Sequence, residues 1–272
     1  MSRLKACFER LGAESKKALI PYVMTGDPQP DVTLPLMHAM VEAGANIIEL
    51  GAPFSDPMAD GPVIQAAAER SLEFHTSLHD VFAIAKQFRE KDDQTPIVMM
   101  GYLNPVEVMG YESFARQAAD CGIDGVITVD MPPEEADDYI VALKKCQIDP
   151  IFLVAPTTTE ERMQKIAAVA SGFVYYVSLK GVTGAATLDT AAVVERVNLI
   201  RKYIDLPIGV GFGINNAETA ASVSRCADAV VVGSAIVNRM AAQKDIKSEQ
   251  TAIIAKDVTD LLKSMREAMD VE

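Results

Sequence analysis

The sequence carries little positive charge, few cysteines and histidines, and no long apolar run. Its 25 Lys and Arg residues stand against 38 Asp and Glu residues, so the formal net charge is −13 and the pI is about 4.7. This balance argues against nucleic-acid binding and against polyphosphate binding through bulk charge. An anionic substrate would then be held by local backbone amides or by a helix N-terminus.

The cysteines and the short apolar runs bear on where the protein works. The four cysteines are widely spaced, form no Cys-x-x-Cys pair and follow no secretory signal, so we expect reduced thiols in a cytoplasmic protein (Cys7, Cys121, Cys146 and Cys226). The longest apolar runs are too short to span a bilayer, so we expect no membrane role.

The three histidines offer little for a metal. His75 and His79 have the i, i+4 spacing of two ligands on one helix, but no acid or cysteine pattern completes a site. Ser77 is expected to begin a new helix between them. We therefore interpret the pair as a solvated face and expect no metal.

Short apolar runs alternate with longer helical patterns along the whole chain. Eight strands are predicted at residues 18–24, 47–50, 97–101, 125–129, 150–154, 173–178, 207–211 and 229–233. Helices are predicted at residues 31–43, 63–74, 78–91, 105–121, 133–146, 159–170, 190–203 and 216–226, with further helices near Leu4–Leu11, at 249–269 and near Ser234.

This order predicts an α/β fold of the (β/α)₈ TIM barrel type, with extra helices at the termini and after strand two. The rival is an open doubly wound sheet, which would carry Gly-x-Gly-x-x-Gly after its first strand. The first strand instead ends in Thr25-Gly26-Asp27-Pro28. No linker or low-complexity segment divides the chain, so we predict one domain over residues 1–272.

Two acidic residues stand where a barrel places its chemistry. Glu49 interrupts the apolar second strand near its carboxyl end, and Asp60 lies on the following loop. A buried carboxyl group has a raised pKa and can exchange protons near neutral pH, which suits a general acid/base. Alternation along the strand places Ile47 and Glu49 on one face. The alternative is a structural Glu49 that pairs with an arginine.

Three glycine-rich loops follow strands six, seven and eight, at residues 181–185, 211–215 and 233–236. Barrels often bind phosphate between the last two of these loops, where backbone amides and a short helix face the anion. The alternative is that the glycines only form tight turns. Lys180 precedes the first loop and could form a Schiff base with a carbonyl group, but a loop lysine more often is solvated or steers an anion.

The motifs together closely resemble the tryptophan synthase α subunit family. They are residues 48–61 (Ile-Glu-Leu-Gly-Ala-Pro-Phe-Ser-Asp-Pro-Met-Ala-Asp-Gly), 100–105, 130–132, 181–184, 211–214 and 233–237, and they span nearly the whole chain. The resemblance implies a carbon–carbon lyase that cleaves indole-3-glycerol phosphate to indole and glyceraldehyde 3-phosphate. It also implies a β-subunit partner in a heterotetramer of two α and two β chains, where the β subunit holds pyridoxal phosphate and joins indole to serine. No cofactor is expected in this chain.

The resemblance also implies roles for single residues. Glu49 matches the general acid/base, Asp60 the carboxylate that binds the indole N–H, and Tyr175 an active-site tyrosine beside Glu49. The substrate pocket would include Tyr22, Tyr102, Ile127, Thr183 and Phe212, and the phosphate site Gly184, Gly213, Gly233 and Ser234. The partner would contact the rim at Asp56, Pro57 and Asn104.

Two departures and three alternatives accompany this interpretation. Tyr22 stands where the family usually has Phe, and Leu179-Lys180 replaces a pair that usually contains Arg. The alternatives are a stand-alone indole-3-glycerol-phosphate lyase, a catalytically weak allosteric subunit, and a Schiff-base aldolase that uses Lys180.

Overall fold

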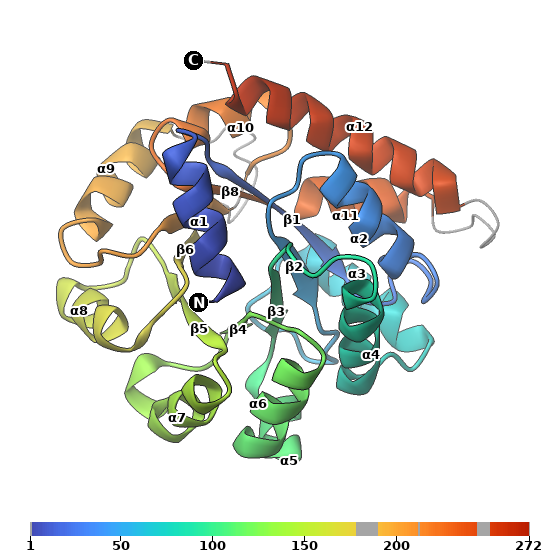
Figure 1. The fold of residues 1–272 in the computed structure, drawn as a ribbon, viewed down its shortest axis with the longest axis horizontal. Helices are drawn as coiled ribbons and strands as arrows, with labels where there is room; N and C mark the ends of the chain where they lie inside the picture. Colours follow the sequence, from blue (N-terminus) through green and yellow to red (C-terminus); the bar gives the residue numbers. More distant parts are fainter. Residues whose placement is uncertain (1, 178–189, 212, 244–250, 272) are drawn as a thin grey trace.

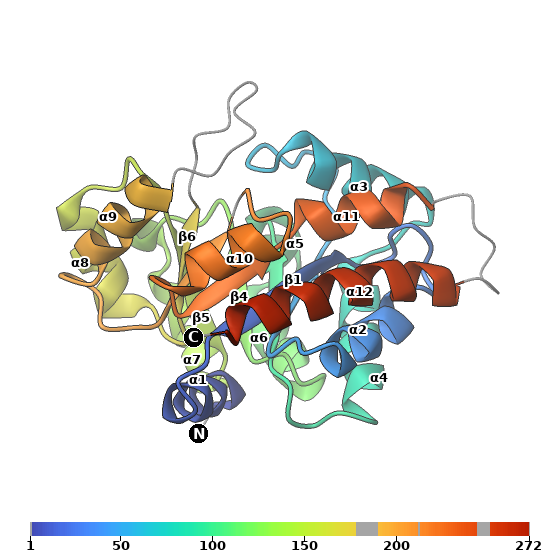
Figure 2. The same cartoon turned by 90° about the horizontal axis from the view of Figure 1, so that it is seen from above.

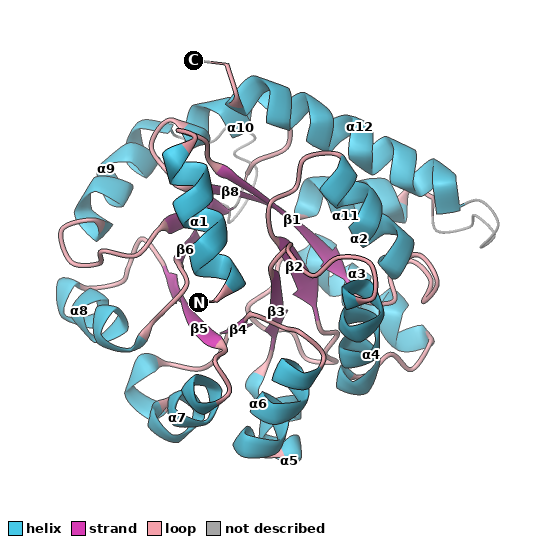
Figure 3. Ribbon diagram, in the orientation of Figure 1, coloured by secondary structure: helices cyan, strands magenta, loops and turns pink. Residues whose placement is uncertain are grey.

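Eight parallel strands close into a barrel in the computed structural model, which describes residues 2–177, 190–211, 213–243 and 251–271. Each strand pairs with the next in sequence, and β8 pairs with β1 (Figure 3). The strands are β1 (Ala18–Met24), β2 (Ile48–Gly51), β3 (Ile97–Gly101), β4 (Gly125–Thr128), β5 (Asp149–Val154), β6 (Val174–Val177), β7 (Ile208–Gly211) and β8 (Ala229–Val232). The predicted (β/α)₈ barrel is confirmed.

Helices surround the strands, most of them as an outer ring and the first across one end of the barrel (Figure 1). They are α1 (Arg3–Ala13), α2 (Thr33–Glu42), α3 (Pro62–Glu73), α4 (Leu78–Arg89), α5 (Leu103–Met109), α6 (Tyr111–Asp120), α7 (Asp137–Lys145), α8 (Glu160–Val169), α9 (Thr190–Ile200), α10 (Ala217–Ser224), α11 (Ser234–Ala241) and α12 (Thr251–Met269). The extra helices are α1 and α12 near the ends of the chain and the second helix, α4, between β2 and β3. None of the described helices is long and apolar enough to cross a membrane.

The two faces of the strands bury different clusters. The outer face packs against the ring of helices, as Leu19 and Leu50 show. The inner face forms the barrel interior, which includes Ile47, Val98 and Ile127. Glu49 is paired in register with Val98 and therefore lies on this inner face, as the alternation from Ile47 predicts.

Two of the predicted helices were wrong in extent. The predicted helix at 105–121 is two helices, α5 and α6, because Gly110 adopts φ 81° between them. The predicted helix at 133–146 begins as a short 3₁₀ turn, Pro133–Glu135, before α7. The predicted ends of the first and third strands are confirmed, the other strand ends differ by at most one residue, and Ser178, the predicted end of the sixth strand, lies outside the described residues. Thr159 and Asn216 are N-caps, whose side chains accept hydrogen bonds from the first turns of α8 and α10.

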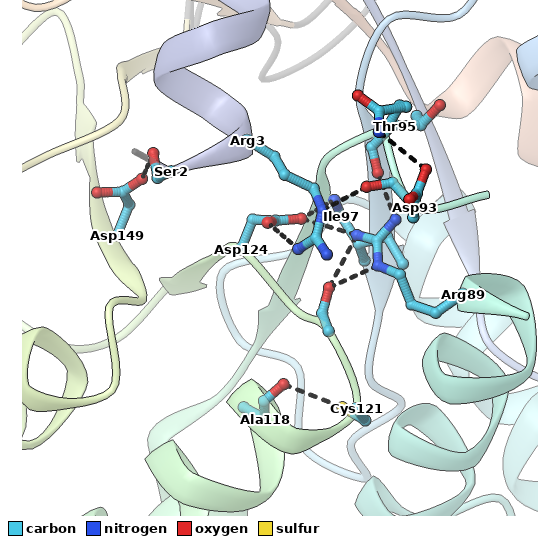
Figure 4. Close-up of polar contacts among 12 residues, drawn as sticks. Ser2, Arg3, Arg89, Asp93, Thr95, Ile97, Ala118, Cys121, Asp124 and Asp149 are labelled. Atoms are coloured by element: carbon cyan, nitrogen blue, oxygen red, sulfur yellow. Dashed lines mark hydrogen bonds and ion pairs between the residues drawn. The ribbon is translucent and has the colours of Figure 1, made fainter.

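The amino-terminal end of the barrel is closed by α1, at the opposite end from α3 and α11 (Figure 2). There the buried Asp124 carboxylate binds three donors: Arg3 Nη1 at 2.8 Å, Arg89 Nη2 at 2.8 Å and the Ile97 amide at 2.8 Å (Figure 4). Arg89 also donates to the Gly122 carbonyl. Because this network is satisfied within the structure and lies away from the mouth, its role is to hold the barrel together.

The long helix α12 packs against α2 and α10, beside the seam where the first and last strands meet. Arg266 of α12 donates from Nη1 to the Lys17 carbonyl at 2.8 Å and to Asn46 Oδ1 at 3.3 Å. Asn46 Oδ1 also accepts from the Leu19 amide at 2.9 Å. The C-terminal helix is thus tied by hydrogen bonds to the beginning of the barrel.

Candidate active site

Glu49 is a buried acid at the center of the barrel mouth. Its side chain is 1% exposed, and Oε2 has no hydrogen-bond partner among the described residues. Burial, and then the charge of Asp60, raises the pKa of Glu49 to about 8. No ion pair in the described part of the chain includes Glu49, so a structural pair with arginine is not supported. With this pKa the group is mostly protonated at neutral pH.

Asp60 is the second carboxyl group of the mouth and lies just before α3. Gln65 of α3 holds its backbone, because Nε2 donates to the Asp60 carbonyl at 2.9 Å. Burial raises the pKa of Asp60 to about 6, while a hydrogen bond from Tyr102 acts in the opposite direction. At neutral pH the pair therefore divides into a neutral Glu49 and an ionised Asp60. Two carboxyl groups with separated pKa values can take the roles of proton donor and charge stabiliser.

Two tyrosines of the barrel interior face these acids. Burial, followed by the charges of the two acids, raises the pKa of Tyr175 well above its ordinary value, and the pKa of Tyr22 is raised for the same reasons. Each ring depends on a glycine in a neighbouring strand. A Cβ atom at Gly51 would overlap the hydroxyl of Tyr22, and one at Gly211 would overlap that of Tyr175. The neutral hydroxyl groups therefore sit at the level of the strand ends.

The structure describes two of the other predicted pocket residues, Ile127 and Tyr102. Ile127 of β4 is fully buried in the barrel interior, and Tyr102 is buried at the N-cap of α5. Thr183 and Phe212 lie outside the described residues. The interior also includes Met100 and Leu153, which sequence reasoning missed. Alternation from Val98 could have found Met100, but parallel strands buried on both faces give a weak alternation signal.

The predicted phosphate residues lie on loops after adjacent strands. Gly233 is the N-cap of α11, and Ser234 is its first residue. The amides of Ile236 and Val237 bond to the Gly233 carbonyl, and the first two amides of the helix have no partner among the residues that the structure describes. Gly213 adopts φ 75° in the loop after β7. Gly184 and Lys180 lie outside the described residues.

The rim of the mouth includes the residues predicted to meet a partner. Asp56 and Asn104 are exposed, and Pro57 is half-buried. Two large apolar side chains on the same rim are also exposed: Met58 at 85% and Val108 at 83%.

A separate cavity of about 590 Å³ opens between the loops that follow β4 and β5, and none of the catalytic candidates lines it.

The described residues contain no group of three or more His, Cys, Asp or Glu side chains that could hold a metal. Ser77 begins α4 between His75 and His79 with a capping box, as predicted from the sequence.

The sequence is similar to that of one protein family over nearly its full length. Residues 8–268 match the family described as tryptophan synthase alpha chain. The tryptophan synthase alpha chain of Thioalkalivibrio sulfidiphilus is 61% identical over 270 residues, covering 99% of this chain and 100% of that protein. The corresponding protein of Methylococcus capsulatus is 57% identical over 99% of this chain and 100% of its own length.

Solved structures agree in fold. Tryptophan synthase subunit alpha of Legionella pneumophila superposes with a TM-score of 0.92 at 43% identity, covering 99% of both chains. A chain from the tryptophan synthase α₂β₂ complex of Pyrococcus furiosus, a structure that concerns mutual activation in that complex, superposes with a TM-score of 0.84 at 34% identity. It covers 92% of this chain and 98% of its own length.

Proposed function

This chain belongs to the tryptophan synthase alpha chain family, whose members cleave indole-3-glycerol phosphate to indole and glyceraldehyde 3-phosphate, and on that premise we propose which residues carry the reaction. The observation that carries the proposal is the pair of carboxyl groups at one mouth, with the pKa of Glu49 raised to about 8 and that of Asp60 to about 6.

Glu49 begins the reaction as the acid. Its proton passes to C3 of the indole ring, and the ring becomes an indoleninium cation. The ionised Asp60 accepts a hydrogen bond from the indole N–H and stabilises that positive charge. Glu49, now a carboxylate, accepts the proton of the glycerol hydroxyl as the C3–carbon bond breaks and its electrons return to the ring. Indole and the aldehyde leave, and Glu49 is again protonated.

The barrel interior shapes the indole pocket around this step. Tyr22, Tyr102, Ile127 and Tyr175 would form its walls, together with Met100. A largely apolar wall excludes water from the cation, so water screens the attraction between the cation and Asp60 less than it would in solution. Tyr175 would lie beside Glu49 and keep the carboxyl group facing the substrate.

The phosphate group would bind at the N-terminus of α11. The free amides of Ser234 and Ala235 and the half-exposed Gly233 support this placement. A net charge of −13 gives no attraction for an anion at long range, so oriented amides and the helix dipole must supply it locally.

The partner is proposed to be a tryptophan synthase β subunit, in a heterotetramer of two α and two β chains. It would dock on the rim at Asp56, Pro57 and Asn104. The exposure of Met58 and Val108 on that rim supports a contact with another protein. The pyridoxal phosphate of the second reaction would belong to that partner, while acid–base chemistry suffices for the cleavage by this chain.

The test is indole release by Glu49→Gln and Asp60→Asn. Each substitution keeps the side-chain shape, and each should lower kcat by about 10²–10⁴-fold, the range of a lost general acid/base or charge stabiliser. Wild type should show a bell-shaped dependence of kcat/KM on pH, with the pair titrating near pH 6 and pH 8. Near wild-type turnover by either folded variant would remove that residue from the mechanism.

A further inference from the structure

Tyr102 makes contacts that a pocket wall would not need. Its ring stacks on Phe54, with centroids 5.0 Å apart and an interplanar angle of 24°. Its hydroxyl oxygen accepts a hydrogen bond from the Ala59 amide at 3.0 Å. Phe54 and Ala59 lie near the two ends of the loop between β2 and α3. One side chain therefore holds this loop at both ends, immediately before Asp60.

The Tyr102 hydroxyl group can donate a hydrogen bond as well as accept one. A tyrosine hydroxyl has one hydrogen to donate and lone pairs to accept with. Since Ala59 N–H occupies a lone pair, the hydrogen is free for the adjacent carboxylate, and a hydrogen bond from Tyr102 is among the causes that act on the pKa of Asp60, which it lowers. A hydrogen bond to an ionised carboxylate is stronger than one between neutral groups.

Tyr102 is itself firmly placed. It directly follows β3, is 5% exposed and is the N-cap of α5. The amide of the next residue, Leu103, donates to Asp130 Oδ1 at 2.8 Å, which ties this turn to the end of β4. The Tyr102 side chain thus fastens the loop before α3 to a turn that follows β3 and is itself bonded to Asp130, just after the end of β4.

We propose that Tyr102 is a positioning residue for Asp60: its hydroxyl group fastens the β2–α3 loop and orients the Asp60 carboxylate toward the indole nitrogen. The inference rests on the proposed role of Asp60 and extends it, because it assigns the hydroxyl group a task separate from lining the pocket. Charge stabilisation needs a dipole or charge that is fixed before the reaction, and the hydrogen bond from Gln65 holds the backbone of Asp60 rather than its carboxylate.

Other groups also face Asp60. Glu49 lies on β2, Tyr22 on β1 and Tyr175 on β6, and all three interact electrostatically with it. All three groups are present both in the wild type and in a variant that lacks the Tyr102 hydroxyl. A shift in the titration of Asp60 in that variant therefore reports the lost hydrogen bond.

The experiment is Tyr102→Phe, which keeps the ring and its stacking on Phe54. The acidic limb of the kcat/KM profile should move to higher pH by about one to two units. This is the rise in the pKa of Asp60 that corresponds to the free energy of a lost hydrogen bond to a charged group. At pH 8, kcat should fall by about tenfold because the carboxylate is less well oriented. KM should change by less than about threefold, since the ring remains. An unchanged limb together with unchanged kcat would overturn the proposal.

Two further variants separate this inference from its premise. In an Asp60→Asn background, Tyr102→Phe should cause little additional loss, because a residue that acts through Asp60 has nothing left to position. A full additional loss would show that Tyr102 acts directly on the substrate and would overturn the proposal. If Asp60→Asn itself keeps wild-type turnover, it is the assignment of Asp60 that fails.

A site-specific 3-fluorotyrosine at position 102 guards against a folding artefact. Its more acidic hydroxyl group is a stronger donor in nearly the same volume, so the acidic limb should move to lower pH, opposite to the shift in Tyr102→Phe. Movement in the same direction as Tyr102→Phe would overturn the proposal. Thermal unfolding of each variant verifies that the native structure is retained.

Discussion

Glu49 should make the native protein less stable as the pH rises, and Glu49→Gln should remove that effect. The carboxyl group has a pKa of about 8 in the folded protein and an ordinary value of 4.5. Below pH 4.5 it is protonated in both states and has no effect. Above that value, unfolding releases its proton, so the native state loses stability until the pH exceeds about 8.

The magnitude follows from these two values. Burial of the Glu49 carboxyl group lowers the free energy of unfolding by about 1 kcal/mol at pH 5 and by about 3 kcal/mol at pH 7, because each pKa unit corresponds to about 1.4 kcal/mol. Gln does not titrate, so any cost of burying its amide is the same at both pH values. The stability difference between Glu49→Gln and wild type should therefore shift by about 2 kcal/mol in favour of the variant between pH 5 and pH 7.

Urea unfolding at pH 5, 6, 7 and 8 measures this difference directly, and thermal midpoints should separate by roughly 2–4 °C per kcal/mol. Glu69→Gln is the matched control, since Glu69 is exposed on α3 and the same chemical change is made there at the surface. Because burial is the larger cause, most of the effect should persist in an Asp60→Asn background. A difference for Glu49→Gln that does not vary with pH would refute the reasoning.

Three other substitutions test the rest of the molecule. Gly233→Ala should fold normally, since the new Cβ would lie 3.8 Å from its nearest neighbour. It should raise KM for the phosphorylated substrate about tenfold or more, because the methyl group crowds the amides of α11. An equal loss with a dephosphorylated analogue would show that the glycine serves packing alone. Asp124→Asn should destabilise the protein by about 3–5 kcal/mol in urea unfolding, because it leaves buried Arg89 without its charge partner, and KM should stay unchanged. Added β subunit should accelerate indole release by wild type. Met58→Ser should reduce this acceleration without changing the rate of the isolated chain. If the β subunit accelerates the variant as much as wild type, the partner binds elsewhere.

The fold was predictable because its signals are local and repeated. Eight apolar runs separated by helical patterns admit few topologies, and Ser77, Thr159 and Asn216 marked helix starts through their own side-chain chemistry. The break at Gly110 was missed, because an isolated glycine within a helical pattern is tolerated at a cost of about 1 kcal/mol and does not by itself predict the end of a helix.

The site was predictable only in its residues. A carboxyl group in an apolar strand drew attention to Glu49, and loop position drew attention to Asp60. The contacts of Tyr102 with Phe54 and Ala59 were not predictable, because they join segments more than 40 residues apart with no periodic pattern. Such contacts depend on how loops pack over the barrel mouth, and no local sequence rule describes that packing.

The hydrogen bonds of Arg266 bear on how the protein forms during its synthesis. They join α12 to Lys17 and Asn46, so residues at opposite ends of the chain stabilise each other. A ribosome that has released β1 to β8 has made every strand, but α2 and α10 still expose the surfaces that α12 covers. The contacts that α12 makes with α2, α10, Lys17 and Asn46 therefore form only after α12 has emerged, and until then the nascent barrel lacks the stability they supply.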